Sequence, residues 1–324
     1  MKRIYFILIA AFTGIAFLVT MAVTGNTRAD GANANTIINS DSLRTLADDV
    51  NTIKYFAAKI PATISFAGEA VPLNDFEVHE RMDRELTING YWHSNTIQNL
   101  KLAHRWFPEI EEILREENVP DDFKYLAMAE SGLRNVVSPG NAHGVWQFLS
   151  ETGTHYGLRI NSEVDERYNV QEATRAACKY LKDAYAKFGN WTLAAASYNA
   201  GMGAIESAVK YQEENSYYDL YLKDETSRYI FRALAFKIIY EHSEQYGFFL
   251  SPDDLYNPLE TKSVQVETSI PDLAAFARNY NTTYKMLKYY NPWLRSTTLT
   301  IHKGERYTLE LPVDAQLKQE GDSK

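Results

Sequence analysis

One glutamate stands where a helix should carry an apolar side chain. Segment 119–132 begins with a proline and two aspartates, which indicate the start of a helix, and its closing glycine indicates the end. Glu130 is spaced seven residues from Phe123 and three from Ala127, so the three side chains share one face. The carboxyl also lies near the helix C-terminus, where the helix dipole disfavours negative charge. Both effects favour the protonated acid, which is the form that gives a proton to a glycosidic oxygen near neutral pH.

Two plainer interpretations of Glu130 stay open: the side chain reaches solvent, or it pairs with Arg134. Two further segments favour a functional role. Residues 140–148 and 197–203 combine glycines with amides, hydroxyls and aromatic rings. Amides and hydroxyls beside one isolated acid suit a neutral, hydroxyl-rich ligand better than a phosphate.

Composition and the remaining motifs exclude several classes of function. The 324 residues carry 42 acids and 33 bases, a formal net charge of −9, which argues against non-specific binding to nucleic acid. The single cysteine, Cys178, excludes an intrachain disulfide framework and a multi-cysteine metal site. His79 begins a zinc-like motif, but Asp83 occupies the second histidine position. Glu206 replaces the third glycine that a dinucleotide site would need after Gly201. We therefore expect neither a metal nor a cofactor.

The N-terminus predicts export. A basic start, Met1–Arg3, precedes an apolar run of 20 residues from Ile4 to Val23. Signal cores have about 7–15 apolar residues and membrane-spanning helices about 20, so residues 1–23 are either a cleaved signal peptide or a retained anchor. Residues 24–65 have the composition of a linker. We expect the protein in the periplasm or cell envelope, with attachment to the inner membrane if the segment is retained.

The rest of the chain divides into a mainly α region and a small mixed module. Apolar periodicity predicts helices over 96–107, 109–117 (with Pro108 in the first turn of a new helix), the segment after Pro120, 173–188, 191–198 and 227–242. A strand at 263–268, helices at 270–280 and 283–290 and a strand at 307–311 form a β-α-α-β unit. The predicted domains are 66–255 and 262–313, followed by a polar tail at 314–324.

Four segments carry a family resemblance. In order, they are Ala129-Glu130-Ser131-Gly132, Gly144-Val145-Trp146-Gln147-Phe148, Ser197-Tyr198-Asn199-Ala200-Gly201 and Glu225-Thr226-Ser227-Arg228-Tyr229. Together they resemble the motifs of lytic transglycosylases of the soluble-lytic-transglycosylase family, in particular the membrane-bound murein transglycosylase D group. Val145, Ser197 and the pair Ser227-Arg228 depart from the family pattern.

The resemblance implies a lysozyme-like helical fold and an activity on peptidoglycan. The reaction would cleave the β-1,4 bond between N-acetylmuramic acid and N-acetylglucosamine and leave a 1,6-anhydromuramic product. Glu130 would act first as the acid and then as the base. Five residues would position the substrate and the acid: Ser131, Gln147, Tyr198, Asn199 and Tyr229.

The terminal β-α-α-β unit resembles a LysM peptidoglycan-binding repeat. Asn291-Pro292 matches the family's helix-ending pair, and residues 304–312 match its closing strand. The usual Gly-Asp-Thr turn at the start is missing, so the unit either binds glycan or serves only for packing.

Two rival functions remain open. A goose-type lysozyme of the same fold would hydrolyse the bond, and a non-catalytic envelope scaffold would only bind glycan. Most glycosidases use two carboxylates, but we interpret the nearest other acids, Glu151 and Glu225, as structural. The expected partner is peptidoglycan, and the sequence leaves the oligomeric state open.

Overall fold

The computed structural model describes residues 57–314. The predicted signal or anchor at 1–23, most of the linker and nearly all of the tail lie outside these residues. Among residues 57–314, no helix has both the length and the apolar character needed to cross a membrane.

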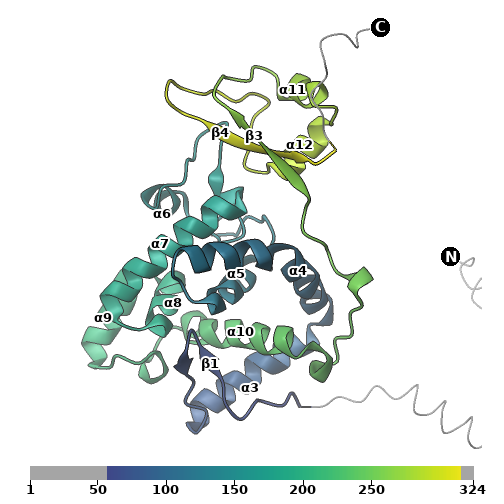
Figure 1. Ribbon diagram of the computed structural model, residues 1–324. Helices are drawn as coiled ribbons and strands as arrows, with labels where there is room; N and C mark the ends of the chain where they lie inside the picture. Colours follow the sequence, from purple (N-terminus) through teal and green to yellow (C-terminus); the bar gives the residue numbers. More distant parts are fainter. Residues whose placement is uncertain (1–56, 315–324) are drawn as a thin grey trace, which may run out of the picture. The chain divides into compact units, whose positions relative to one another are not determined.

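The larger part of the described chain is helical, as the sequence predicts (Figure 1). A short hairpin, β1 (Ser65–Phe66) and β2 (Glu69–Ala70), precedes the helices. The helices are α3 (Phe76–Tyr91), α4 (His93–Glu116), α5 (Lys124–Ser131), α6 (Ser150–His155), α7 (Val170–Phe188), α8 (Trp191–Ala200), α9 (Met202–Gln212) and α10 (Asp224–Glu241). Short 3-10 turns lie at Asp121–Phe123, Glu166–Tyr168, Tyr217–Asp219, Ser243–Tyr246 and Pro252–Asp254.

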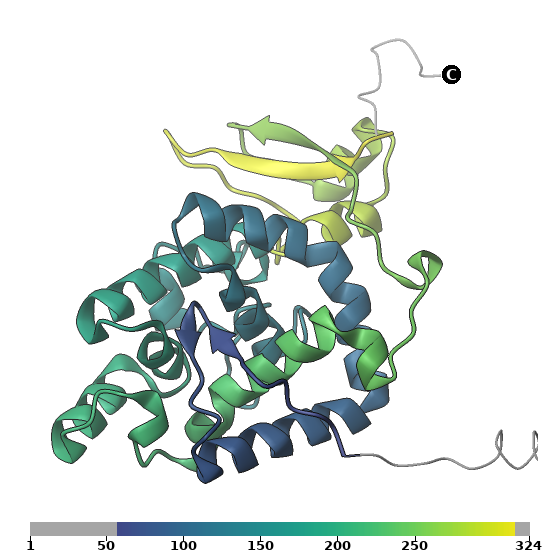
Figure 2. The same ribbon diagram turned by 60° about the horizontal axis from the view of Figure 1, so that its bottom comes forward.

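Helix α5 lies in the middle of the helical region. Its residues Phe123 (at the N-cap), Leu126 and Ala127 are fully buried, as their spacing predicts. Helices α4 and α10 pack against it, and α10 also packs against α3 and α8. Figure 2 shows α3 and α10 together on one side of this bundle. The central position of α5 is what brings Glu130, near its end, among residues from distant parts of the chain.

The prediction that Pro108 begins a new helix is wrong, because α4 runs unbroken from His93 to Glu116. Proline removes one backbone hydrogen bond in a helix interior. The buried stripe nevertheless continues across it: Phe107, Ile110 and Leu114 are all at most 1% exposed and share one face. Burial of that continuous stripe holds the helix together where local rules alone predict a break.

The C-terminal unit has the predicted β-α-α-β order: β3 (Thr261–Val266), α11 (Leu273–Asn279), α12 (Tyr284–Tyr290) and β4 (Tyr307–Pro312). The two strands are antiparallel, with Ser263 opposite Glu310. The buried side chain of Asn291 joins the end of α12 to β4. Its amide donates to the carbonyls of Leu287 (2.9 Å) and Glu310 (2.6 Å), and its oxygen accepts from the backbone N–H of Glu310 (2.8 Å).

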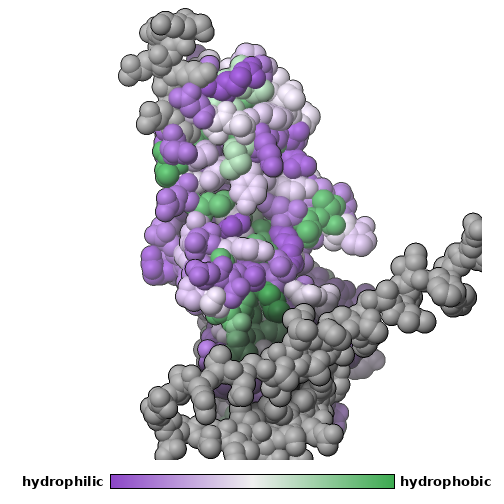
Figure 3. Space-filling model, turned by 90° about the vertical axis from the view of Figure 1, so that its right-hand side faces the viewer, coloured by the Kyte–Doolittle hydropathy of each residue, from purple (hydrophilic) through white to green (hydrophobic). Residues whose placement is uncertain are grey.

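This unit packs directly on the helical region through segment 163–168. The backbone N–H of Asp165 donates to the carbonyl of Trp293 (2.9 Å), and that of Arg295 donates to the carbonyl of Glu163 (2.7 Å). Val164 is buried in the core of the C-terminal unit. The face drawn in Figure 3 is mostly hydrophilic, and its apolar residues gather in small separate groups.

Candidate active site around Glu130

Glu130 lies at the C-terminal end of α5 and is partly buried. Its carboxylate accepts a hydrogen bond from the phenol of Tyr229 on α10. Desolvation raises the pKa of Glu130 to about 7, in the direction that the sequence predicts. The Tyr229 hydrogen bond and the charge of Arg232 oppose this rise, and the charge of Glu225 adds to it. A carboxyl with this pKa holds a proton in a substantial fraction of molecules at neutral pH.

The alternative in which Glu130 pairs with Arg134 is not what the structure shows. In the part of the chain that the structure describes, Arg134 makes no ion pair. Its backbone N–H instead approaches the Ser131 hydroxyl at 3.3 Å. The partner of Glu130 is therefore a neutral phenol.

Two tyrosines stand beside this carboxyl. Tyr229 is 2% exposed, and burial raises the pKa of its phenol well above the ordinary range, so it stays protonated and remains a donor. Burial raises the pKa of Tyr198 in the same way, and the charge of Glu130 adds to the effect. The Tyr198 hydroxyl donates to the carbonyl of Trp146 at 2.8 Å. The structure thus brings Glu130, Tyr198 and Tyr229 together.

Ser131 and Gln147 bind backbone carbonyls. The Ser131 hydroxyl donates to Val145 at 2.7 Å, which fixes the start of the loop that follows. The Gln147 amide donates to Gly144 (2.7 Å) and Val136 (3.1 Å) and leaves its oxygen without a partner in residues 57–314. Both side chains hold loop 144–148 in place, and their role toward substrate stays a prediction.

The start of this loop approaches neighbouring backbone so closely that it requires glycine. Gly144 has φ +82°, and a Cβ there would lie 1.7 Å from the carbonyl oxygen of Arg167. Trp146, two residues on, is fully buried and donates from its indole N–H to the hydroxyl of Thr174 at 2.8 Å. The aromatic ring of this motif therefore belongs to the core and presents no face to a ligand.

Asn199 connects two of the motifs. Its side-chain oxygen accepts from the hydroxyl of Thr226 at 2.8 Å, which joins the end of α8 to the start of α10. The side-chain nitrogen of Asn199 has no hydrogen-bond partner among the described residues. Its predicted contact with substrate stays a prediction.

Sequence reasoning missed a charged group behind Tyr229. Glu85 on α3 is 1% exposed; it accepts from the guanidinium of Arg228 (2.5 Å) and lies 3.9 Å from that of Arg232. Glu225, Tyr229 and Arg232 follow one another at spacings of four and three, so they share a face of α10. That spacing was readable in the sequence. The partner on α3 was not.

The described residues hold no group of three His, Cys, Asp or Glu side chains suited to a metal ion. Cys178 is fully buried, and burial raises the pKa of its thiol to about 12. The thiol is therefore protonated at neutral pH and is a poor nucleophile or ligand.

Two family models match the regions just described. Residues 107–221 match the transglycosylase SLT domain. Residues 262–315 match the C-terminal LysM-like domain of soluble lytic transglycosylases. The chain carries an SLT transglycosylase domain and a LysM-like domain. The lysozyme-like class of the helical region and the LysM-like class of the C-terminal unit, both predicted from the sequence, are thereby confirmed.

Curated relatives agree with this assignment. The chain is 28% identical over 246 residues to the membrane-bound lytic murein transglycosylase D of Escherichia coli K12, which covers 74% of this chain and 52% of the relative. It is 26% identical over 98 residues to a putative tributyltin chloride resistance protein of an Alteromonas species, covering 30% of this chain and 47% of the relative. The chain thus spans about half the length of each of these curated relatives. Among solved structures, the lytic transglycosylase Slt of Pseudomonas aeruginosa aligns with a TM-score of 0.34 and 19% identity, over 47% of this chain and 26% of that one.

Proposed function

We propose that the protein is a lytic transglycosylase that cleaves the β-1,4 bond between N-acetylmuramic acid and N-acetylglucosamine in peptidoglycan. The observation that carries the proposal is the pair formed by Glu130 and Tyr229. It supplies one desolvated carboxyl with a pKa near 7 and a neutral donor that fixes its position. The SLT domain and the murein transglycosylase homologue support the choice of substrate.

One carboxyl can carry both proton transfers of this reaction. Protonated Glu130 gives its proton to the leaving glycosidic oxygen as the bond to C1 breaks. The resulting carboxylate accepts the proton of the muramoyl C6 hydroxyl while that oxygen bonds to C1. The product is a 1,6-anhydro sugar, no water is consumed, and Glu130 is again protonated. Assistance by the substrate's N-acetyl group replaces the second carboxylate of ordinary glycosidases.

Five residues serve this reaction around the acid in our proposal. Tyr229 supports by hydrogen bonding the charge that develops on the Glu130 carboxylate, and Tyr198, whose proton is donated to Trp146, contributes its oxygen lone pairs and its ring beside the acid. Asn199 and the free oxygen of Gln147 contact substrate hydroxyl or amide groups. Ser131 positions the acid indirectly, because it ties the end of α5 to loop 144–148.

One observation favours the rival hydrolase. The charge of Glu225 raises the pKa of Glu130, so this carboxylate lies within electrostatic reach of the acid. A hydrolase would need such a group to activate water. The Glu225→Gln variant distinguishes a transglycosylase from a hydrolase. In a transglycosylase the variant keeps its turnover, and the pKa of Glu130 falls slightly because a negative neighbour is lost. In a hydrolase, turnover is lost.

The proposed location follows from the substrate. We propose that the protein acts in the cell envelope or periplasm, with residues 1–23 as a signal peptide or inner-membrane anchor. The relative's name, membrane-bound lytic murein transglycosylase D, supports an envelope location.

The deciding experiment digests purified sacculi and analyses the released muropeptides by mass spectrometry. We expect anhydro sugars, which are lighter by one water than the reducing ends a hydrolase releases. We expect Glu130→Gln to release none. Reducing ends as the sole product would establish the hydrolase, and sacculus binding without any release would establish the scaffold.

A further inference from the structure

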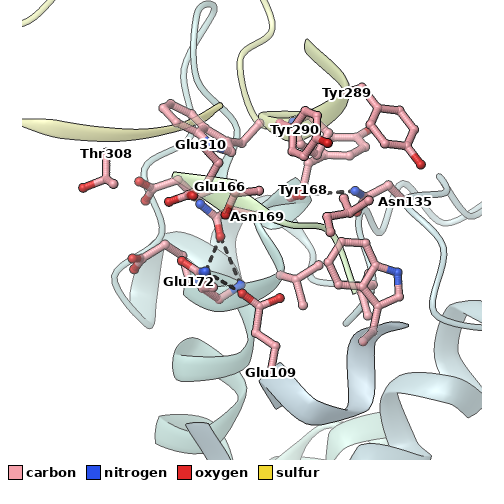
Figure 4. A pocket seen from close by; sticks show the side chains of 18 of the residues that line it. Glu109, Asn135, Glu166, Tyr168, Asn169, Glu172, Tyr289, Tyr290, Thr308 and Glu310 are labelled. Atoms are coloured by element: carbon pink, nitrogen blue, oxygen red, sulfur yellow. Dashed lines mark hydrogen bonds between the residues drawn. The ribbon is translucent and has the colours of Figure 1, made fainter. Parts of the chain in front are cut away.

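A cavity of about 1090 Å³ lies between the helical region and the LysM-like unit (Figure 4). Helix α4 and the start of α7 form one wall, and α12 and β4 form the other. None of the six candidate site residues lines it. Small-molecule pockets commonly measure about 300–1,000 Å³, so this cavity has room for an oligomeric ligand.

Both walls present aromatic rings to the cavity. Trp106 comes from α4, and Tyr289 and Tyr290 come from the end of α12. Tyr289 is 51% exposed, and its ring lies edge-on to that of Tyr290 with centroids 5.8 Å apart. Within residues 57–314, the indole N–H of Trp106 and the phenol of Tyr290 make no hydrogen bond. The rings of Trp106 and Tyr290 therefore offer flat apolar faces together with unused polar atoms, whereas the Tyr289 hydroxyl already accepts from Arg105 at 3.2 Å.

Carboxylates from the two walls face the same space. Glu109 on α4 accepts from the amide of Gln171 at 2.5 Å, and Glu310 on β4 accepts from the hydroxyl of Ser263 at 2.7 Å. Figure 4 shows Glu109 at the bottom of the view and Glu310 opposite it. Burial raises the pKa of Glu109, and the charge of Glu310 adds to this effect. Each carboxylate has oxygen capacity left for a ligand hydroxyl or amide.

The charges around the cavity are of both signs, and several are already engaged within the protein. Arg159 binds Glu166 and lies over the ring of Tyr307 at 3.9 Å. The ammonium of Lys288 donates to two backbone carbonyls of its own unit. Such a lining offers no concentration of one sign for a polyanion or a polycation, and it suits a neutral ligand with many hydroxyl groups.

We propose that this cavity binds a stretch of N-acetylated glycan away from the reacting bond, with one wall from each domain. A pyranose ring has an apolar face that stacks on Trp106 or Tyr290, and its hydroxyls and acetamido groups pair with carboxylates. The inference rests on the proposed function in one respect, the identification of the ligand as a peptidoglycan-type sugar. The LysM-like unit alone supplies only one of the two walls.

The test is a calorimetric titration of the full-length Glu130→Gln variant with a β-1,4-linked N-acetylglucosamine hexamer. We compare it with double variants that add Tyr290→Ala on the LysM-like wall or Glu109→Gln on the helical wall. Each change should weaken one binding event about tenfold, as loss of one well-packed anchor does. Tyr211→Ala is the matched control, because this tyrosine is 89% exposed and lies outside the cavity lining. Thermal melting of each variant verifies its folding.

Every other result overturns the proposal. Unchanged titrations in both double variants would show that the cavity holds no glycan. An effect of Tyr290→Ala alone would assign binding to the LysM-like unit by itself. Tight binding of a sugar-free stem peptide, lost in the same variants, would assign the cavity to peptide. Because the titration needs no turnover, a failure of the proposed reaction shows in the sacculus digest and leaves this result unaffected.

Discussion

The phenol of Tyr229 donates a hydrogen bond to the carboxylate of Glu130 and so joins α10 to the C-terminal end of α5. Two opposing effects meet at this contact: burial favours the protonated carboxyl, and the hydrogen bond favours the carboxylate. Their balance holds the pKa of Glu130 at about 7. The contact therefore sets the pH range in which the acid can work, as well as its position.

Tyr229→Phe should move the alkaline limb of the kcat/KM profile to higher pH. The change removes an interaction that stabilises the carboxylate, so the pKa of Glu130 rises and the acid stays protonated to higher pH. The maximal rate should fall by about 10²-fold, as when a donor to developing charge is lost. The profile is measured on sacculi or soluble glycan strands.

Tyr240→Phe serves as the control for this prediction. Tyr240 lies on the same helix and is partly buried, and its phenol donates no hydrogen bond within residues 57–314. Its profile should match that of the wild type. If the alkaline limb of the Tyr229→Phe profile lies at the same pH as that of the wild type, or at a lower pH, the hydrogen bond does not stabilise the carboxylate.

Glu130→Gln should make the protein more stable at pH 8 while abolishing its activity. The pKa of Glu130 is raised from 4.5 in the unfolded chain to about 7 in the fold. Between these values the native state binds more protons than the unfolded state, so stability falls as pH rises through this range. Glutamine has no charge to desolvate and avoids this loss.

The free energy of unfolding of Glu130→Gln should exceed that of the wild type by on the order of 1–3 kcal/mol at pH 8, at 1.36 kcal/mol per pKa unit. The difference should vanish near pH 4, where the wild-type carboxyl is protonated in the fold. Urea unfolding of both proteins at the two pH values measures it. An equal difference at both pH values would assign the effect to packing and not to ionisation.

Glu85→Gln should destabilise the fold by about 3 kcal/mol, because it removes the buried anion from Arg232 and leaves Arg228 only its exposed partner Asp224. Glu85 is 1% exposed and contacts both Arg228 and Arg232. Denaturant unfolding measures the loss. Glu77→Gln is the matched control on the same helix, since its pair with Arg81 is more exposed than the Glu85 pair and should contribute less than about 1 kcal/mol. Equal losses in the two variants would contradict a special role for the buried pair.

Local patterns in the sequence were sufficient to predict those features that depend on a single helix or strand. The spacing of Phe123, Ala127 and Glu130 predicts their common face, because helical periodicity is a property of α5 alone. The order of the β-α-α-β unit is predicted in the same way, because each of its two strands and two helices can be recognised within a short segment.

Features that depend on a partner from elsewhere in the chain could not be predicted. Glu85 looks like any other glutamate of an amphipathic helix until α10 places two arginines against it. Trp146 looked suited to a ligand, but Thr174 on α7 takes its indole N–H inside the core. The packing of Val164 into the C-terminal unit depends on Leu294, far along the chain, with which it forms a β-bridge. In each case the local pattern is compatible with several environments, and tertiary packing selects one.

Gly144→Ala should disrupt loop 144–148, and with it any contact between Gln147 and substrate. The new Cβ would lie 1.7 Å from the carbonyl oxygen of Arg167, a backbone atom that cannot turn aside, at a φ of +82°. The loss should exceed the roughly 1 kcal/mol that a left-handed conformation alone costs a non-glycine residue. Gly189→Ala isolates that smaller cost, because Gly189 has φ +76° and no atom within 4 Å of its would-be Cβ. Measurements of the unfolding free energy and of turnover should therefore distinguish the two variants. Gly189→Ala should keep its activity at slightly lower stability, whereas Gly144→Ala should lose activity and much of its stability. Equal behaviour of the two would show that the loop moves away from Arg167 without consequence.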